Sequence, residues 1–204
     1  MKIVITDISH SIYANVICAT IESAAQIRGT GIAKRAPEYI ISKMEKGNAI
    51  IAVDGDKFAG FCYIETWEHG RFVANSGLIV HPDYRGLGLA KKIKTRIFEL
   101  SKTKFPEAKI FSITTGLAVM KMNNELGYKP VTFSELTKDQ SFWKGCQTCK
   151  NYDVLQRTNQ DMCLCTGMLY QPNKKEIENK SVKPKVFKRL TQIKQSIFLK
   201  KDKK

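Results

Sequence analysis

The segment His81-Pro-Asp-Tyr-Arg-Gly-Leu-Gly-Leu-Ala90 joins a β-rich run that ends at Val80 to a helical pattern that begins after Gly88. Gly86 and Gly88 let the backbone turn its N–H groups toward an anion, because neither residue has a Cβ in the way. The N-terminus of the following helix adds about half a positive charge at the same place. The segment therefore predicts a phosphate-binding turn between a strand and a helix.

Patterns on both sides of this turn predict a mixed order of helices and strands. In the first helix, capped by Ser9, the apolar residues Ile12, Val16, Ala19 and Ile21 recur at helical spacing. Three β-rich runs separated by glycine-containing loops then precede the turn, which is typical of an antiparallel meander. The expected elements are a strand at 2–6, helices at 9–28 and 37–46, strands at 49–53, 58–67 and 72–80, a helix at 86–100, a strand at 109–114, a helix at 116–126 and strands beyond it. This order belongs to the α+β or α/β classes.

The chain has a net charge of +15, from 34 Lys and Arg against 19 Asp and Glu in 204 residues. Residues 171–204 hold twelve Lys and Arg and three Asp and Glu, a net charge of +9, so +6 belongs to residues 1–170. Such an excess attracts nucleic acid, an anionic membrane or acidic small molecules. The tail and the rest of the chain therefore need separate explanations.

Composition excludes several classes of protein. With 43% hydrophobic residues, the chain is neither disordered, collagen-like nor a small disulfide scaffold. No apolar run approaches the ~18 to 20 residues of a membrane span, and the N-terminus shows no secretory signal pattern. We therefore expect a cytoplasmic protein in which Cys18 and Cys62 are buried, reduced thiols.

The glycine turn fits neither the P-loop nor the Gly-x-Gly-x-x-Gly dinucleotide fingerprint. Instead, Arg85-Gly-Leu-Gly-Leu-Ala90 resembles the Gln/Arg-x-x-Gly-x-Gly/Ala loop for the acyl-CoA pyrophosphate in the GNAT superfamily of N-acetyltransferases. The segment Leu78-Ile-Val-His-Pro-Asp-Tyr84 resembles the family's fourth strand and its exit, and Glu125-Leu-Gly-Tyr128 resembles the end of its fourth helix. The resemblance covers residues 1 to 133 and implies the GNAT fold, an α+β (mixed α/β) fold. Its central, mostly antiparallel sheet is splayed between strands 4 and 5 and flanked by helices.

This resemblance implies acetyl-CoA, or another acyl-CoA, as the acyl donor. The Arg85 side chain and the backbone N–H groups of 87–90 are expected to hold the pyrophosphate, and main-chain groups of Leu78 and Val80 the pantetheine amides. A backbone N–H near Leu78 or Ile79 is the expected oxyanion donor. The implied cofactor-binding residues are Leu78, Ile79, Val80, Arg85, Gly86, Leu87, Gly88, Leu89 and Ala90.

Acyl transfer to an amine requires that the amine lose a proton and that the leaving thiolate be neutralised. For the base we favour Glu65, with Glu68 and His81 as alternatives that could also act through water. Many family members carry a Tyr four residues before the glycine of the fourth-helix motif, but here that position is Asn123. Asn123 or the neighbouring Asn124 is therefore expected to hydrogen-bond the sulfur or the pantetheine, unless solvent protonates the thiolate.

The connector after the first helix contains Arg28, Lys34 and Arg35 among glycines. In the family this connector lies beside the acceptor pocket, so these cations are candidate ligands for an acceptor carboxylate; a basic surface loop is the alternative. Together with the later paired cysteines, the sequence is similar to GNAT proteins associated with arginine biosynthesis in Bacteroidetes. That resemblance implies glutamate as the amine and an acetyl or succinyl group as the acyl group.

Two pairs of cysteines follow the expected GNAT core of residues 1–133. Cys146 and Cys149, with Cys163 and Cys165, suggest a tetrahedral structural Zn²⁺ site; packed reduced thiols or a redox pair are the alternatives. Residues 134–172 are thus expected to form a Cys-rich extension, with a short helix at 134–143 and a closing strand at 166–171. Residues 173–204 form a basic tail, amphipathic from 183, which we expect to dock on its own domain or on a second subunit.

The sequence predicts an acyl-CoA-dependent N-acyltransferase that acetylates or succinylates a small acidic amino acid. One alternative is a GNAT enzyme for another small amine or a protein amine. The other is a basic, zinc-containing protein that binds nucleic acid, although no aromatic-interleaved basic strand supports it. The expected partner is a small amine substrate, with a homodimer as one possible assembly.

Overall fold

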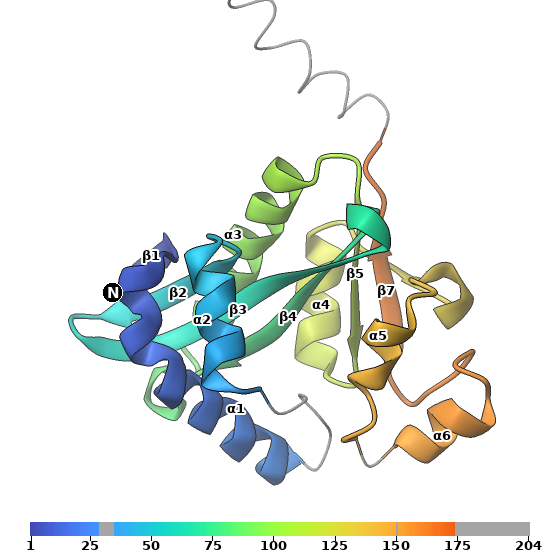
Figure 1. The fold of residues 1–204 in the computed structure, drawn as a ribbon, viewed down its shortest axis with the longest axis horizontal. Coiled ribbons are helices and arrows are strands. Elements are labelled where there is room, and N and C mark those ends of the chain that lie inside the picture. Colours follow the sequence, from blue (N-terminus) through green and yellow to red (C-terminus); the bar gives the residue numbers. More distant parts are fainter. Residues whose placement is uncertain (29–34, 150, 174–204) are drawn as a thin grey trace, which may run out of the picture. The chain divides into compact units, whose positions relative to one another are not determined.

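One mixed β-sheet organises the computed structural model, which describes residues 1–28, 35–149 and 151–173 (Figure 1). Its strands are β1 (Lys2–Ile5), β2 (Ala49–Asp54), β3 (Lys57–Trp67), β4 (Phe72–Val80), β5 (Lys109–Thr114), β6 (Lys129–Val131) and β7 (Thr166–Tyr170). They lie in the order β1-β2-β3-β4-β5-β7-β6, and every neighbouring pair is antiparallel except β4 and β5. The expected GNAT-like α/β fold is confirmed.

Helices cover both faces of the sheet. The helices are α1 (Ala14–Arg28), α2 (Pro37–Glu45), α3 (Leu89–Lys104), α4 (Leu117–Glu125), α5 (Gln140–Lys144) and α6 (Tyr152–Arg157). One apolar cluster joins α3 to the sheet, a second joins α1 and α2 to β2 and β3, and a third joins α5 and α6 to β4, β5 and β7. Alternate residues of a strand share a face, and on β3 Glu65 lies on the face of the second cluster. Glu65 pairs directly with Ala74 on β4, which belongs to the third cluster, so the two clusters lie on the same face. Figure 1 shows α3 and α4 on the opposite face.

The parallel strands β4 and β5 pair over only a short length. Phe72, Val73 and Ala74 pair with Lys109, Ile110 and Phe111, and the pairing stops there. Beyond this point β4 continues along β3, whereas β5 continues along β7. The sheet therefore opens between β4 and β5 after Ala74, as the GNAT resemblance implies.

A β-bulge lies in the part of β4 that pairs with β3 but not with β5. Phe61 of β3 pairs with Ile79, but Tyr63 pairs with Ser76, so β4 contains one extra residue in this interval. Gly77 has a φ of +64°, and a Cβ there would lie 2.3 Å from a ring carbon of Tyr63. Only glycine fits here, because it tolerates the left-handed conformation and leaves room for the Tyr63 ring.

The buried face of the first helix differs from the prediction. Ile12 is 76% exposed, and Val16 and Ala19 are exposed as well, whereas Ala14, Ile17, Ile21 and Ala24 are buried. The cause is a 3₁₀ helix at Ile8–Tyr13, capped by Asp7 rather than Ser9, which precedes α1. Because a 3₁₀ helix has about three residues per turn, it shifts the phase of the apolar positions.

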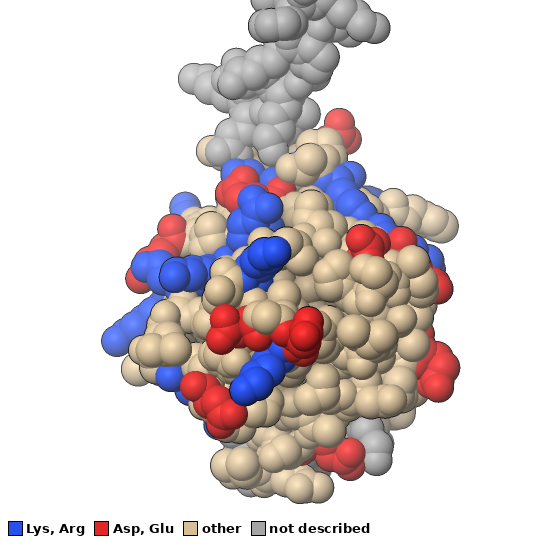
Figure 2. All heavy atoms as spheres, turned by 90° about the vertical axis from the view of Figure 1, so that its left-hand side faces the viewer, with Lys and Arg blue, Asp and Glu red and all other residues tan. Residues whose placement is uncertain are grey.

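Charge on the face toward β1 is mixed rather than continuous. Figure 2 shows Lys and Arg interspersed with Asp and Glu on the face toward β1, beside a broad area with neither. Among the described residues, no helix has both the length and the apolar character needed to cross a bilayer. The amphipathic tail expected from residue 183 onward lies outside the described residues.

Candidate active site

The turn between β4 and α3 has the geometry of an anion site. Gly86 and Gly88 have φ angles of +81° and +70°, and no atom lies within 4 Å of a Cβ built at either position. Gly88 is the N-cap of α3 and provides no side-chain cap, so the first N–H groups of α3 have no acceptor within the helix. Open space, left-handed glycines and an uncapped helix N-terminus thus meet where a pyrophosphate is expected.

Arg85 is anchored beside this turn. Its Nε donates a hydrogen bond to the Val80 carbonyl at 3.2 Å, and its side chain is exposed. The remaining guanidinium N–H groups can therefore face an anion in front of the α3 N-terminus. The turn brings together the predicted pyrophosphate residues. The predicted pantetheine residues Leu78 and Val80 lie on the part of β4 that runs along β3 but does not pair with β5.

Glu65 lies at the centre of a polar cluster on the other face of the sheet. Its side chain is 13% exposed and extends from β3 toward α2. The hydroxyl of Tyr39 donates to Glu65 Oε1, and an Arg35 nitrogen lies 3.9 Å from Oε2. The Arg35 Nε donates to the Tyr63 hydroxyl at 2.7 Å. Partners on α2 and on the preceding connector therefore hold both carboxylate oxygens.

A second cation belongs to this cluster. The Lys43 ammonium lies 4.7 Å from the ring centroid of Tyr39 and 5.9 Å from that of Tyr63. Burial lowers the pKa of Lys43, and the Glu65 carboxylate partly offsets this effect. Burial, reinforced by Glu65, raises the pKa of Tyr39 and of Tyr63 well above the usual tyrosine value, so both remain protonated donors. Two cations thus face one carboxylate, which leaves the cluster positive.

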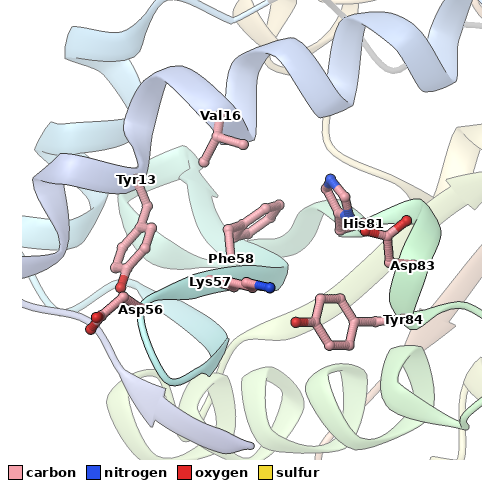
Figure 3. Close-up of a pocket in the computed structure, with 8 residues that line it drawn as sticks. All are labelled: Tyr13, Val16, Asp56, Lys57, Phe58, His81, Asp83 and Tyr84. Carbon is pink, nitrogen blue, oxygen red and sulfur yellow. Dashed lines mark ion pairs between the residues drawn. The ribbon is translucent and has the colours of Figure 1, made fainter.

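The alternative bases occupy other positions. Glu68 Oε1 accepts hydrogen bonds from the Thr137 hydroxyl and the Lys138 N–H, both at 2.8 Å, so this carboxylate ties the β3–β4 turn to the segment before α5. His81 Nδ1 lies 3.6 Å from an Asp83 carboxylate oxygen. His81 lines a pocket of about 500 Å³ between the start of α1, the β2–β3 turn and the β4–α3 turn, which contains no member of the Glu65 cluster (Figure 3).

Asn123 is fully buried on α4. Its amide nitrogen donates to the Met168 sulfur at 3.6 Å, and its carbonyl oxygen has no hydrogen-bond partner. An amide cannot act as a general acid at neutral pH. The unsatisfied oxygen could accept a hydrogen bond, but it is buried in this structure, so the expected contact with pantetheine or with its thiol stays a prediction.

Of the predicted acceptor residues, the structure places Arg35 in the Glu65 cluster. Arg28 ends α1, but its side chain and the whole of Lys34 lie outside the described residues. Sequence reasoning missed Tyr39 and Lys43. The signal was their spacing, because residues four apart on a helix share one face.

The zinc prediction for the four cysteines is not supported. Cys146, Cys149, Cys163 and Cys165 are free, and no group of three or more His, Cys, Asp or Glu among the described residues is placed to hold a metal ion. Burial raises the pKa of Cys146 to about 11 and that of Cys165 to about 12, with neighbouring thiols adding to the effect. Three of these side chains pack instead against the apolar cluster of α5 and α6.

Comparison with known proteins gives one family match. Residues 30–121 match the model of the acetyltransferase (GNAT) family. A search of curated proteins finds no match.

Solved structures with the same fold share little sequence with this chain. N-acetylglutamate synthase from Neisseria gonorrhoeae, complexed with coenzyme A and N-acetyl-glutamate, aligns with a TM-score of 0.61 and 15% identity, over 85% of this chain and 35% of that one. Rv2747 from Mycobacterium tuberculosis, in complex with CoA and NLQ, aligns with a TM-score of 0.59 and 13% identity, over 84% of this chain and 99% of that one. The acetyltransferase YncA from Salmonella typhimurium, with acetyl-CoA, aligns with a TM-score of 0.55 and 13% identity, over 85% and 95%. This chain therefore spans about a third of the N. gonorrhoeae enzyme.

Proposed function

Because residues 30–121 match the GNAT acetyltransferase family, we propose that the chain transfers an acetyl or succinyl group from its CoA thioester to the amine of a small acidic amino acid, glutamate in the first instance. The observation that carries this proposal is the Glu65 cluster. It combines a carboxylate that can accept a proton with two cations, Arg35 and Lys43, that can bind a carboxylate.

The acyl-CoA is bound along the β4–α3 turn and the adjoining part of β4. Arg85 and the backbone N–H groups of 87–90 bind the pyrophosphate at the start of α3. Main-chain groups of Leu78 and Val80 bind the pantetheine, and the bulge at Gly77 turns a backbone N–H near Leu78 toward the acyl oxygen. The acyl carbon then lies in the opening between β4 and β5.

Glu65 removes the proton from the attacking amine, directly or through one water. Tyr39 and Arg35 orient its carboxylate, because each holds a different oxygen. No covalent enzyme intermediate is needed, since the amine attacks the thioester directly. Arg35 and Lys43, together with Arg28 and Lys34 of the connector, bind the carboxylates of the acceptor.

One name among the similar folds supports an amino-acid acceptor, and another supports the acyl donor. The N. gonorrhoeae enzyme is described with N-acetyl-glutamate, and YncA with acetyl-CoA. We extend the proposal to a cytoplasmic location, where CoA thioesters and amino acids are both abundant.

The direct test is a thiol-release assay with acetyl-CoA and succinyl-CoA over a panel of amino acids. We expect turnover with glutamate and much slower turnover with neutral amino acids such as glutamine. Turnover with basic amines but not with glutamate contradicts the acceptor and retains the acyl transfer.

Arg35→Gln tests the acceptor site separately. Loss of the guanidinium should raise KM for glutamate by about tenfold or more, since a charge-assisted hydrogen bond is worth about 1.5 to 3 kcal/mol. KM for the acyl-CoA should change little. Lys57→Gln, which removes a cation from the pocket in Figure 3, is the matched control and should leave both constants unchanged.

A further inference from the structure

A lysine is buried at the point where the sheet opens. Lys94 of α3 is 1% exposed, and its ammonium lies 3.4 Å from the side-chain oxygen of Asn75 and 5.1 Å from the ring centroid of Tyr128. Among the described residues, no carboxylate forms an ion pair with it. A buried ammonium without a counter-charge is costly, so such groups are rare outside functional sites.

Lys94 lies between the phosphate turn and the opening of the sheet. Lys94 is six residues beyond Gly88, which is about 9 Å along the helix axis. Its partner Asn75 is the first residue of β4 past the last pair with β5, which is Ala74 with Phe111. The ammonium therefore lies on the α3 face of the sheet, beside the residue of β4 at which the gap to β5 begins.

The surrounding groups hold Asn75 in place rather than neutralise Lys94. The Asn75 amide donates to the Ser101 hydroxyl at 2.8 Å, and its oxygen also accepts from the Tyr128 hydroxyl at 3.1 Å. The groups that face Lys94 are Asn75 from β4, Tyr128 from the segment before β6 and the Cys62 thiol from β3. The Cys62 thiol donates to the Ser76 carbonyl at 3.3 Å, and burial raises its pKa to about 12, so it is neutral.

We propose that the Lys94 ammonium stabilises the thiolate of the departing CoA at the closed end of the β4–β5 opening. This inference rests on the proposed acyl transfer and adds to it a residue that acts on the leaving group. Burial lowers the pKa of Lys94 to about 8, and a negative charge on the neighbouring sulfur favours the charged form of the lysine.

The step balances as follows. The amine nitrogen bonds to the acyl carbon, the carbon–sulfur bond breaks, and its electron pair stays on sulfur. The charged Lys94 ammonium stabilises that thiolate and keeps its own proton, and the thiolate takes a proton from solvent to give the free thiol. The proton lost by the amine goes to Glu65, which releases it to solvent before the next turnover.

The first experiment titrates the thiol of CoA bound to the whole protein, using the ultraviolet absorbance of the thiolate. In the complex with Lys94→Met, the pKa of the bound thiol should be higher than in the wild-type complex by about 1 to 3 units, because a neighbouring opposite charge has that effect. Arg96→Met removes an exposed cation from the same helix and should leave the thiol pKa at its wild-type value. Equal thiol pKa values in all three complexes overturn the proposal.

A second measurement needs no variant. The wild-type affinity for CoA, relative to desulfo-CoA, should increase from about pH 6 to about pH 8 as the bound thiolate forms beside the ammonium. A ratio that stays constant over this range overturns the proposal, even if Lys94→Met fails to bind CoA.

Turnover provides the third test. Lys94→Met should lower kcat with acetyl-CoA by about 100-fold, because the negative charge that develops on sulfur loses its counter-charge. With the selenoester analogue the loss should be less than about tenfold, because a selenolate leaves without help. Equal losses with both donors contradict the assignment. A wild-type protein that acylates no amine refutes the proposed function alone if its bound thiol titrates as expected.

Discussion

Glu65 has both carboxylate oxygens engaged by other side chains, whereas Glu68 is tied to Thr137 and to the backbone of Lys138. The two residues are only three apart in sequence, yet the alternation of β3 and the turn that follows it send them to different partners. This difference assigns the role of base to Glu65 in our proposal. It could not be read from the sequence, because both residues end the same β-rich run.

Glu65→Gln should lower kcat by about 10²- to 10⁴-fold, the usual contribution of a general base. KM for the acyl-CoA should change little, because the phosphate turn is on another part of the fold. Glu68→Gln is the control, and its kcat should stay within about tenfold of wild type. A larger loss from Glu68→Gln than from Glu65→Gln, as measured by initial rates of thiol release, would reverse the assignment.

Lys94 should make stability depend on pH in a defined direction. Burial lowers its pKa from 10.5 to about 8, so between these values the unfolded chain binds more protons than the folded protein. The free energy of unfolding should therefore rise with pH across this interval, by about 3 kcal/mol at most.

The check is urea unfolding at several pH values. Below about pH 8, Lys94→Met should be more stable than wild type, because the buried charge is gone, and it should lose the rise with pH. Arg96→Met should keep the wild-type dependence. A Lys94→Met protein that is less stable than wild type at neutral pH would show that the ammonium is a structural partner.

At the level of elements, the phosphate turn depends on backbone conformation and on open space. Gly88→Val introduces a β-branched residue at a φ of +70° without a clash in the protein itself. We expect CoA affinity, measured by calorimetry, to fall by at least about tenfold, while the far-ultraviolet circular dichroism spectrum is retained.

Gly55→Val is the matched control for Gly88→Val. Gly55 also has a positive φ, of +57°, and open space around its Cβ position, but it lies in the β2–β3 turn. It should lose a similar amount of stability and keep its CoA affinity. Equal loss of CoA affinity in both variants would remove the phosphate-turn assignment.

The bulge in β4 needs a glycine for lack of space as well as for its backbone conformation. Gly77→Ala should lower the free energy of unfolding by at least about 2 kcal/mol, because the new Cβ overlaps the Tyr63 ring and takes up a left-handed backbone. The melting temperature reports this loss. An unchanged melting temperature would mean that the bulge can be rebuilt without glycine.

Most elements were predictable, because their boundaries carry local signals. Strand β5 was expected at 109–114 and is found at Lys109–Thr114, and helix α2 begins at Pro37 as predicted. The prediction of the buried face of α1 was wrong, because a 3₁₀ helix is not distinguishable from an α-helix by periodicity over so few residues. The bulge at Gly77 was also missed, although a glycine inside a β-rich run is its usual sign.

The site was predictable only where one segment supplies it. The phosphate turn comes from ten consecutive residues, so one stretch of sequence contains all the residues that form it. The Glu65 cluster joins α2, β3 and the connector, and Lys94 meets Asn75 across nineteen positions. Such meetings depend on tertiary packing, which spacing along one element does not reveal.

For the whole molecule, the division of the chain into a core at 1–133, a Cys-rich extension at 134–172 and a tail at 173–204 remains a prediction, as does a homodimer. The net charge of +9 in residues 171–204 sets the tail apart. The face in Figure 2 mixes both signs of charge, which does not favour nucleic-acid binding by that face.

Removal of residues 174–204 should leave kcat/KM for thiol release within about twofold of the full chain. It should also abolish most retention on DNA at low salt, because the retention is electrostatic and the basic residues are gone. Filter binding at several salt concentrations measures this. Retention that persists, with an unchanged salt dependence, would locate a nucleic-acid surface on the remaining residues.

Strand β7 lies between β5 and β6, although the chain makes it last of the three. During synthesis, β5 emerges with one edge joined to β4 by only three residue pairs, and its other edge stays open until residues 166–170 have been made. An open strand edge can recruit the wrong partner, and pairing across so long an intervening segment is slow. Strand β5, which forms one side of the opening proposed to receive the acyl group, is thus fully paired only late in synthesis. A nascent chain therefore has the phosphate turn before the opening between β4 and β5 is complete.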